Sequence, residues 1–305
     1  MDIYFVALYF FVYSFLGWCT EVAFAAWKEH RFVNRGFLNG PFCPIYGFGV
    51  SLVIVFLMPY RSNLVFLYIA SVVLVTVLEG LTGWAMDKIF HNKWWDYSEI
   101  PLNIGGYVCL IFSLIWGVAC VIIINLIHPL IHKGLALLPH TLGIVLIVLL
   151  GILLMADACV TASAIFKFNR QLEHMEKIAA ELHELSEQLG ENIYSTTVRV
   201  MEAADDIQEK AQDAVEDIHE LRQDTAENVR AKAQEAIEEI YERRQDAAES
   251  VREHIEDLRK RYSELNQGTG KVTKRLLRAF PSLESRRHKE RVNEIRRQLK
   301  EKRKK

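Results

Sequence analysis

The feature that most constrains this sequence is a series of long apolar segments in its first half. A helix needs about 20 apolar residues to cross the roughly 30 Å hydrocarbon core of a membrane. Four segments meet that requirement: residues 3–27, 64–86, 105–127 and 141–163. A fifth apolar run, 48–59, is too short on its own. The chain is therefore expected to be an all-α protein whose residues 1–165 form a polytopic membrane helical bundle of about five spans.

The stretch before the short fifth run is rich in Gly and Pro. Residues 34–47 contain Gly40-Pro41 and Pro44, and two prolines three positions apart disrupt regular helix pairing. We expect the second span to be broken or re-entrant at this point. Irregular backbone at membrane depth is tolerated where it lines a cavity, and interrupted spans point to substrate sites in transporters. The stretch is therefore predicted to form the wall of a site.

The charges predict an orientation. Five spans place the two termini on opposite sides, and connections rich in Lys and Arg stay in the cytoplasm. With the N-terminus outside, the inside connections carry seven basic residues: Lys28, Arg31, Arg35, Lys88, Lys93, Lys167 and Arg170. The outside connections then carry only Arg61 and Lys133. We expect a multi-pass protein of the cell membrane with a cytoplasmic C-terminal part.

Three carboxylates lie within or close to the inner ends of spans: Glu21, Glu79 and Asp157. Ionisable groups in a span are costly, and they mark functional sites or interior pairs by default. Glu79 lies eight residues from the end of its span, which favours a site. The alternative is a protonated carboxyl hydrogen-bonded to a neighbouring helix. For Glu21 and Asp157, solvation at a helix end is an equally good interpretation.

A second unusual stretch, residues 87–106, contains Trp94-Trp95-Asp96-Tyr97 and Asn103. Trp and Tyr favour the membrane interface, so an interfacial belt is one interpretation. The other is that Asp96 and Asn103 face the same cavity as Asn39. Cys109 follows on the next span. The predicted substrate- or ion-binding residues are Glu21, Asn34, Arg35, Asn39, Cys43, Tyr46, Glu79, Trp95, Asp96, Tyr97, Asn103 and Cys109.

Several short motifs of the first half occur together: Gly17-Trp18 with Glu21, Asn34-Arg35-Gly36, Gly40-Pro41, residues 43–47, Glu79, residues 95–98, Asn103, Cys109-Leu110 and Trp116-Gly117. In this combination the chain resembles the bacterial ABC-transporter type IV (CmpB-like) membrane proteins over about residues 1–165. The resemblance implies a membrane permease component. The sequence has no Gly-x-x-x-x-Gly-Lys-[Ser/Thr] phosphate loop, so an ATPase subunit would be a separate polypeptide.

The chemistry-bearing residues leave three functional hypotheses open. Five cysteines without a Cys-x-x-Cys motif predict no disulfide framework, no zinc site and no cofactor. The first hypothesis is a permease-like protein with a cytoplasm-facing polar site. The second is a membrane enzyme that uses Glu79 or Asp96 as acid or base on a lipid-soluble substrate, although no catalytic constellation stands out. The third is a membrane-anchored coiled-coil scaffold.

Residues 166–266 form an acidic stalk with 11-residue repeats over 200–254. Residues 211–230 match residues 233–252 at 13 of 20 positions. Eleven residues in three turns give a nearly straight helix, so Val200–His254 would make a rod on the order of 80 Å long. Its narrow apolar stripe needs a partner, and a self-associating coiled coil in a homo-oligomer is favoured. A lipid-bound helix or a lone solvated helix are the alternatives.

The last part, residues 267–305, is basic, with 15 Lys and Arg against 4 Glu. A hinge at Gly268–Gly270 precedes a helix that Pro281 ends, and Val292, Ile295 and Leu299 mark a second helix. Polybasic segments bind anionic membrane lipids, and the acidic stalk is a competing partner. Nucleic acid is the least favoured partner, since stacking aromatics are scarce. The predicted lipid- or partner-binding residues are Lys271, Lys274, Arg275 and Arg278.

Overall fold

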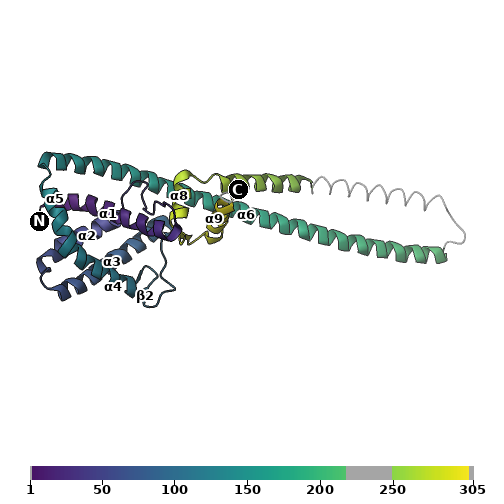
Figure 1. Ribbon diagram of the computed structural model, residues 1–305. Helices are drawn as coiled ribbons and strands as arrows, with labels where there is room; N and C mark the ends of the chain where they lie inside the picture. Colours follow the sequence, from purple (N-terminus) through teal and green to yellow (C-terminus); the bar gives the residue numbers. More distant parts are fainter. Residues whose placement is uncertain (1, 218–248, 302–305) are drawn as a thin grey trace. The chain divides into compact units, whose positions relative to one another are not determined.

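The computed structural model of the chain describes residues 2–217 and 249–301. The chain divides into two compact units, and Figure 1 follows their elements along the sequence. One unit, here called the membrane domain, consists of Met1–Leu172 together with Thr269–Lys305. The other unit, Glu173–Gly268, is here called the arm.

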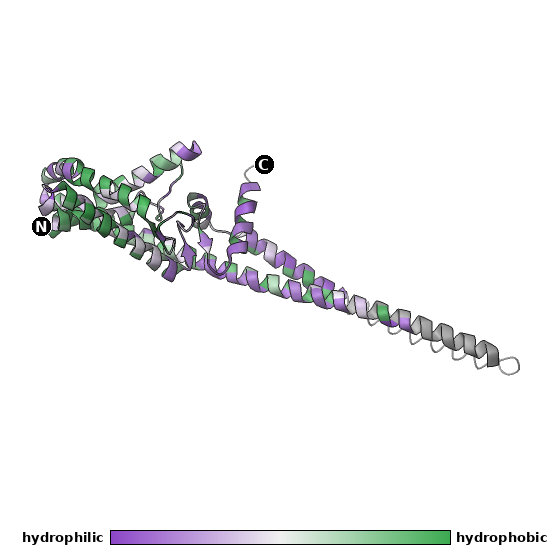
Figure 2. Cartoon of the chain, turned by 90° about the horizontal axis from the view of Figure 1, so that it is seen from below, coloured by the Kyte–Doolittle hydropathy of each residue, from purple (hydrophilic) through white to green (hydrophobic). Residues whose placement is uncertain are grey.

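Within the described residues, four helices are long and apolar enough to cross a membrane. They are α1 (Ile3–Glu29), α3 (Leu64–Phe90), the segment Leu110–Ala136 and the first part of α6 (His140–Asp217). The third of these joins α4 (Leu110–Ile122), a π-helical turn η2 (Ile123–Ile127) and α5 (His128–Ala136). Many large apolar residues of these helices are exposed, and the green colour in Figure 2 marks these helices as hydrophobic. The expected all-α membrane bundle is confirmed.

The fifth apolar segment is the short helix α2 (Pro44–Leu57), which continues into the 3₁₀ turn η1 (Met58–Tyr60). Residues 30–43 before it have no regular secondary structure, as the Gly/Pro stretch predicts. Pro44 is the first residue of α2, a position where the missing N–H of proline costs no hydrogen bond. The prolines therefore delay the start of this helix rather than kink its interior.

The core of the bundle consists of two apolar clusters, one on each side of α2. Val50 and Ile54 pack with Tyr9 and Tyr13 of α1. On the other side of α2, a second cluster is formed by Val53, Leu57, Leu67, Cys120 and Ile124. Because longer helices flank it, the short α2 does not need to span the hydrocarbon on its own.

The connections α1–α2 and α3–α4 lie at one end of the bundle, here called the tail side. The second connection holds three two-residue strands: β1 (Asn92–Lys93), β2 (Asn103–Ile104) and β3 (Val108–Cys109). Strands β2 and β3 form an antiparallel hairpin in which Asn103 faces Cys109. Its turn contains Gly105 and Gly106 at φ values of +61° and +73°, which favour glycine.

The basic tail folds back onto the tail side of the membrane domain. It consists of α8 (Lys271–Ala279), β4 (Glu284–Ser285) and α9 (Lys289–Glu301). Strand β4 pairs antiparallel with β1, and Ala279 is buried against Ala25 and Val33. The composition suggested a third, separate part, whereas the structure joins the tail to the first half of the chain.

The arm contains the continuation of α6 and a helical segment at 249–267. His254 Nε2 lies 3.2 Å from Glu181 Oε1, whereas one straight helix would separate these residues by on the order of 110 Å. A single uninterrupted rod over 200–254 is therefore wrong. Two narrow apolar stripes of one chain can cover each other without a second molecule. The repeats at 218–248 lie outside the described residues.

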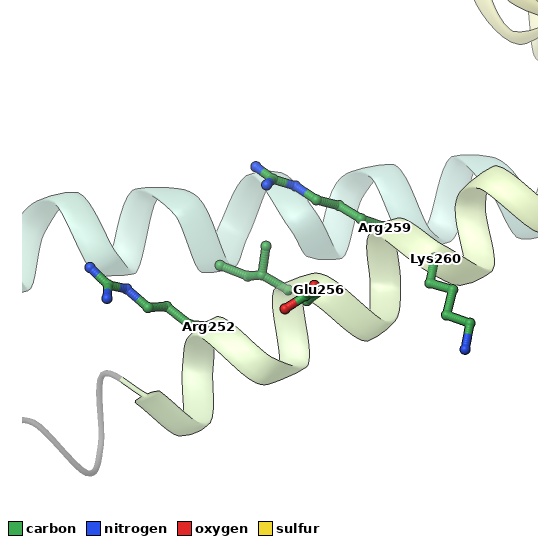
Figure 3. A pocket seen from close by; sticks show the side chains of 5 residues that line it. Arg252, Glu256, Arg259 and Lys260 are labelled. Atoms are coloured by element: carbon green, nitrogen blue, oxygen red, sulfur yellow. The ribbon is translucent and has the colours of Figure 1, made fainter.

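The side of residues 249–267 that carries a shallow hollow is basic. Figure 3 shows Arg252, Glu256, Arg259 and Lys260 around it, while Ile255 is buried. All four labelled side chains are exposed. This hollow is an open, solvated surface of the arm.

Candidate functional site

Glu79 is a buried carboxylate in the middle of the bundle. It lies on α3 with 9% of its surface exposed. Its Oε1 accepts a hydrogen bond from the Tyr97 hydroxyl over 3.3 Å, and Tyr97 in turn stacks on Phe112. Its Oε2 has no hydrogen-bond partner among the described residues. A buried carboxylate oxygen without a partner is costly, so this atom marks a place where a bound group would stabilise the protein.

Glu21 on α1 is paired with the irregular stretch before α2. The Tyr46 hydroxyl donates to Glu21 Oε1 over 2.6 Å, and Arg35 Nε lies 3.6 Å from Glu21 Oε2. Tyr46 reaches this position because α1 has no side chain at Gly17, where a Cβ would lie 2.5 Å from Tyr46 Cβ. The Tyr46 ring also meets the Trp116 ring edge to face at 5.7 Å.

The two carboxylates belong to one group of side chains. Burial raises the pKa of the Tyr97 hydroxyl, and the neighbouring Glu79, Cys109 and Glu21 raise it further. Tyr46 has Glu21, Cys43 and Tyr97 as its neighbours. The structure thus brings six of the predicted site residues together from four parts of the sequence. This carboxylate–phenol cluster consists of Glu21, Cys43, Tyr46, Glu79, Tyr97 and Cys109.

Asp157 on α6 binds the irregular stretch before α2 at Asn39 and Gly40. Its Oδ1 accepts from Asn39 N and Nδ2 at 3.1 and 2.8 Å, and its Oδ2 accepts from Gly40 N at 2.6 Å. Thr161 donates to the same carboxylate over 3.3 Å. Gly40 permits this approach, since a Cβ there would lie 3.2 Å from Asp157 Oδ2. Asp157 is therefore a structural clamp whose oxygens are already satisfied.

Arg275 of the tail is bound by the same stretch. Its guanidinium donates to Asn39 Oδ1, Gly36 O and Phe37 O at 3.1, 2.7 and 2.9 Å. Burial lowers the pKa of Arg275, and the neighbouring Asp157 carboxylate opposes that shift. The oxygens of residues 34–39 that surround Arg275 are here called the carbonyl cage. Asn34 holds this segment in place, because its side chain accepts a hydrogen bond from Trp18 Nε1 and donates one to Asn39 O. Arg275 thus contacts protein atoms, and we remove it from the residues expected to meet lipid.

The connection between α3 and α4 is held by its own polar residues. Asp96 Oδ1 accepts from Lys93 Nζ at 2.9 Å and from the Ser98 hydroxyl and backbone N–H. Burial raises the pKa of Asp96, but these hydrogen bonds and the charge of Lys93 together outweigh that effect and bring the pKa to about 2. Trp95 Nε1 donates to Tyr107 O over 2.8 Å, and Asn103 caps Ile100 O. The structure places these three residues in the loop framework, apart from the carboxylate–phenol cluster.

Two polar groups escaped the sequence analysis. Asp87 is buried at the end of α3, where it accepts from Tyr107 Oη and forms an ion pair with Arg286 of the tail. At the opposite end of the bundle, His128 and His132 contact tyrosines of α1. The four-residue spacing of these histidines was a signal available in the sequence.

The described residues contain no group of three or more His, Cys, Asp or Glu side chains that could hold a metal ion. The fold is that of an all-α membrane protein, and the carboxylate–phenol cluster is its candidate site. Residues 8–162 match the family described as "Putative ABC-transporter type IV", and the chain belongs to this family. The resemblance found in the sequence is thereby confirmed. No curated protein and no solved structure matches the chain.

Proposed function

We propose that the membrane domain is a permease-type component whose carboxylate–phenol cluster binds a cation or a protonated polar group. The observation that carries the proposal is Glu79 Oε2, a buried carboxylate oxygen without a hydrogen-bond partner in the described part of the chain. A positively charged or hydrogen-donating ligand would supply the missing interaction. The phenols of Tyr46 and Tyr97 each donate a hydrogen bond to one of the two carboxylates, Tyr46 to Glu21 and Tyr97 to Glu79.

The place of the cluster in the fold supports a transport role. It lies where the second apolar segment is interrupted, beside irregular backbone that runs into α2. Substrate sites of transporters are commonly built at such interruptions. As a permease component of the ABC type, this chain would work with a separate ATPase subunit, because its sequence carries no phosphate loop.

The proposed orientation places the tail side in the cytoplasm. Lys28, Arg31, Arg35, Lys88 and Lys93 all belong to connections on that side. The other end carries Arg61 and Lys133 alone among the Lys and Arg of the connections. The positive-inside rule then sets the N-terminus outside and makes the cluster cytoplasm-facing.

The basic face of α8 supports a contact with anionic lipid headgroups on the same side. Lys271 and Arg278 are exposed and Lys274 is half-buried, while Leu276 and Leu277 are buried. Each basic residue near an anionic surface contributes about 1 kcal/mol. These three residues remain in the proposed lipid-binding set.

A binding experiment on the full chain in lipid nanodiscs tests the site. The probes are chloride salts of Na⁺, K⁺, Mg²⁺, tetramethylammonium and spermidine, and the readout is the thermal unfolding temperature. At least one probe is expected to stabilise the wild type by mass action. Glu79→Gln should abolish that shift, whereas Glu99→Gln, which changes an exposed carboxylate, should keep it. No shift in the wild type, or an equal shift in Glu79→Gln, overturns the proposal.

A further inference from the structure

A second polar cluster lies inside the bundle at the end opposite to the tail. Tyr9 Oη lies 2.5 Å from His132 Nδ1, and Tyr13 Oη lies 3.2 Å from His128 Nδ1. These four residues are the histidine–tyrosine cluster. His128 is only 2% exposed, whereas His132 is exposed at the rim. A buried histidine in a segment long enough to span a membrane is a functional candidate by default.

The four residues come from two helices, and the spacing on one helix matches the spacing on the other. The tyrosines are four residues apart on α1, and the histidines are four residues apart on α5. The helices run in opposite directions, so the earlier tyrosine meets the later histidine. The imidazole centroids are 6.2 Å apart, close to the roughly 6 Å rise of four helical residues. Both pairs therefore repeat one interaction.

The helix is irregular directly before His128. Residues Ile123–Ile127 form a π-helical turn, and such turns are frequent at functional sites. One extra residue in a turn rotates everything after it by roughly 100° about the helix axis. The π turn thus sets which face of α5 carries His128 and His132 toward α1. The packing that surrounds the pairs is apolar, with Val50 and Ile54 from α2 and Phe5 from α1.

We propose that the histidine–tyrosine cluster is a proton-binding site that takes up one proton from the side of the membrane opposite to the tail. A phenol hydroxyl both donates and accepts. It can donate to Nδ1 of a neutral imidazole, or accept from the Nδ1–H of an imidazolium. Each hydrogen bond therefore survives uptake of a proton by its histidine. The proton comes from solvent at the exposed His132 and leaves as it entered, so no other reactant is needed.

The two histidines hold one proton between them. Two imidazolium rings at this separation repel each other, and solvent screens the buried ring of His128 poorly. The groups facing His128 are the phenols of Tyr9 and Tyr13 from α1 and the His132 ring on its own helix, while α2 contributes apolar side chains. Among the described residues, none of these neighbours is a carboxylate that could balance a second positive charge. The site does not depend on a ligand at Glu79.

Titration of the imidazoles tests the proposal. The full chain is labelled with ¹⁵N-histidine, placed in lipid nanodiscs and followed by NMR between about pH 4 and 9, the range in which histidines titrate. His128→Gln and His132→Gln assign the two resonances. In the wild type the two resonances should shift together as the pair takes up one proton, and in His132→Gln the remaining ring should titrate alone with a different midpoint. His183→Gln, which removes an exposed histidine of α6, should leave the pair unchanged.

Variants that keep both imidazoles test the proposal even if the histidine variants do not fold. Tyr9→Phe and Tyr13→Phe each delete one hydroxyl from the cluster. Loss of that hydrogen bond should change the proton affinity of the facing ring by about two- to tenfold. The proposal is overturned if the His128 signal never titrates in this range. It is equally overturned if His128 titrates identically in the wild type, in His132→Gln and in Tyr13→Phe.

Discussion

The guanidinium Nε of Arg275 donates to Asn39 Oδ1 over 3.1 Å, although the two residues are 236 positions apart in the chain. The same side chain also reaches Gly36 O and Phe37 O. One arginine of the tail therefore closes the loop that precedes α2. Asp157 of α6 binds the same loop. The loop before α2 therefore contacts both the tail and α6.

Replacing Arg275 should release the tail. Arg275→Gln loses the charge-assisted hydrogen bonds to the carbonyl cage, at a cost of about 2–3 kcal/mol in docking free energy. Limited proteolysis at Gly268–Gly270 should become faster by about tenfold or more. Arg278→Gln is the matched control, since Arg278 is an exposed arginine of the same helix. Equal cleavage rates in both variants would mean that Arg275 does not hold the tail.

Asp157 and Glu79 should respond in opposite ways to neutral replacement. Asp157→Asn places an amide NH₂ opposite the N–H groups of Asn39 or Gly40, so it should destabilise the protein by about 1–3 kcal/mol. Glu79→Gln keeps an acceptor for Tyr97 and removes a charge that lacks a partner, so stability should change by less than about 1 kcal/mol. Thermal unfolding of both variants without ligand measures the difference. A larger loss in Glu79→Gln would contradict the roles assigned here.

Gly17 should not tolerate a methyl group. A Cβ there would lie 2.5 Å from Tyr46 Cβ, so Gly17→Ala should separate α1 from α2 and cost about 1–3 kcal/mol. Gly151→Ala is the control, because nothing lies within 4 Å of a Cβ at that position of α6. It should gain up to about 1 kcal/mol in helix propensity. The unfolding temperatures of the two variants should therefore move in opposite directions.

The stability of the α3–α4 connection should depend on pH because of Asp96. Its pKa of about 2 lies below the usual 3.8, so the folded loop prefers the charged carboxylate. The stabilisation is complete above about pH 4 and is lost as the pH falls toward 2. The protection of the Ser98 amide, whose N–H donates to Asp96, should fall over that window when its exchange rate is compared with the intrinsic rate at the same pH. Asp96→Asn should show low protection at every pH, and a wild-type protection without such a step would refute the prediction.

The arm should crosslink within one chain. In a cysteine-free background, Glu181→Cys with His254→Cys should be joined by a short bismaleimide crosslinker, because the ends of the native side chains lie 3.2 Å apart. Glu202→Cys with His254→Cys is the control, as Glu202 is about 30 Å further along α6. A monomeric product on a denaturing gel supports the intramolecular pairing. A dimeric product would instead favour pairing between two chains.

Local chemistry determined what the sequence could reveal. The delayed start of α2 follows from Pro44 itself, and Gly17 with Tyr46 were both recognisable as unusual residues in an apolar setting. The loop role of Asp96 was also readable, since an Asp that accepts from the N–H two residues later is a common turn. Its aromatic neighbours drew attention to a cavity instead.

Contacts between distant segments could not be predicted in this way. The basic composition of the tail is compatible with lipid, with the acidic stalk or with backbone carbonyls, and only tertiary packing selects the cage around Arg275. The pairing of His128 with Tyr13 likewise depends on the π turn and on the antiparallel register of two helices. Neither follows from residue spacing on α5 alone.

The pairing of β1 with β4 can form only late in the synthesis of this protein. Lys93 and Glu284 pair across 191 residues of chain, so β1 must wait for β4 to be synthesised. At about 5–20 residues per second, that delay is roughly 10–40 s. All the apolar helices can enter the membrane during this time, while the carbonyl cage of residues 34–39 still faces water. A ribosome that stalls before Lys271 would therefore leave an inserted bundle with an open tail side.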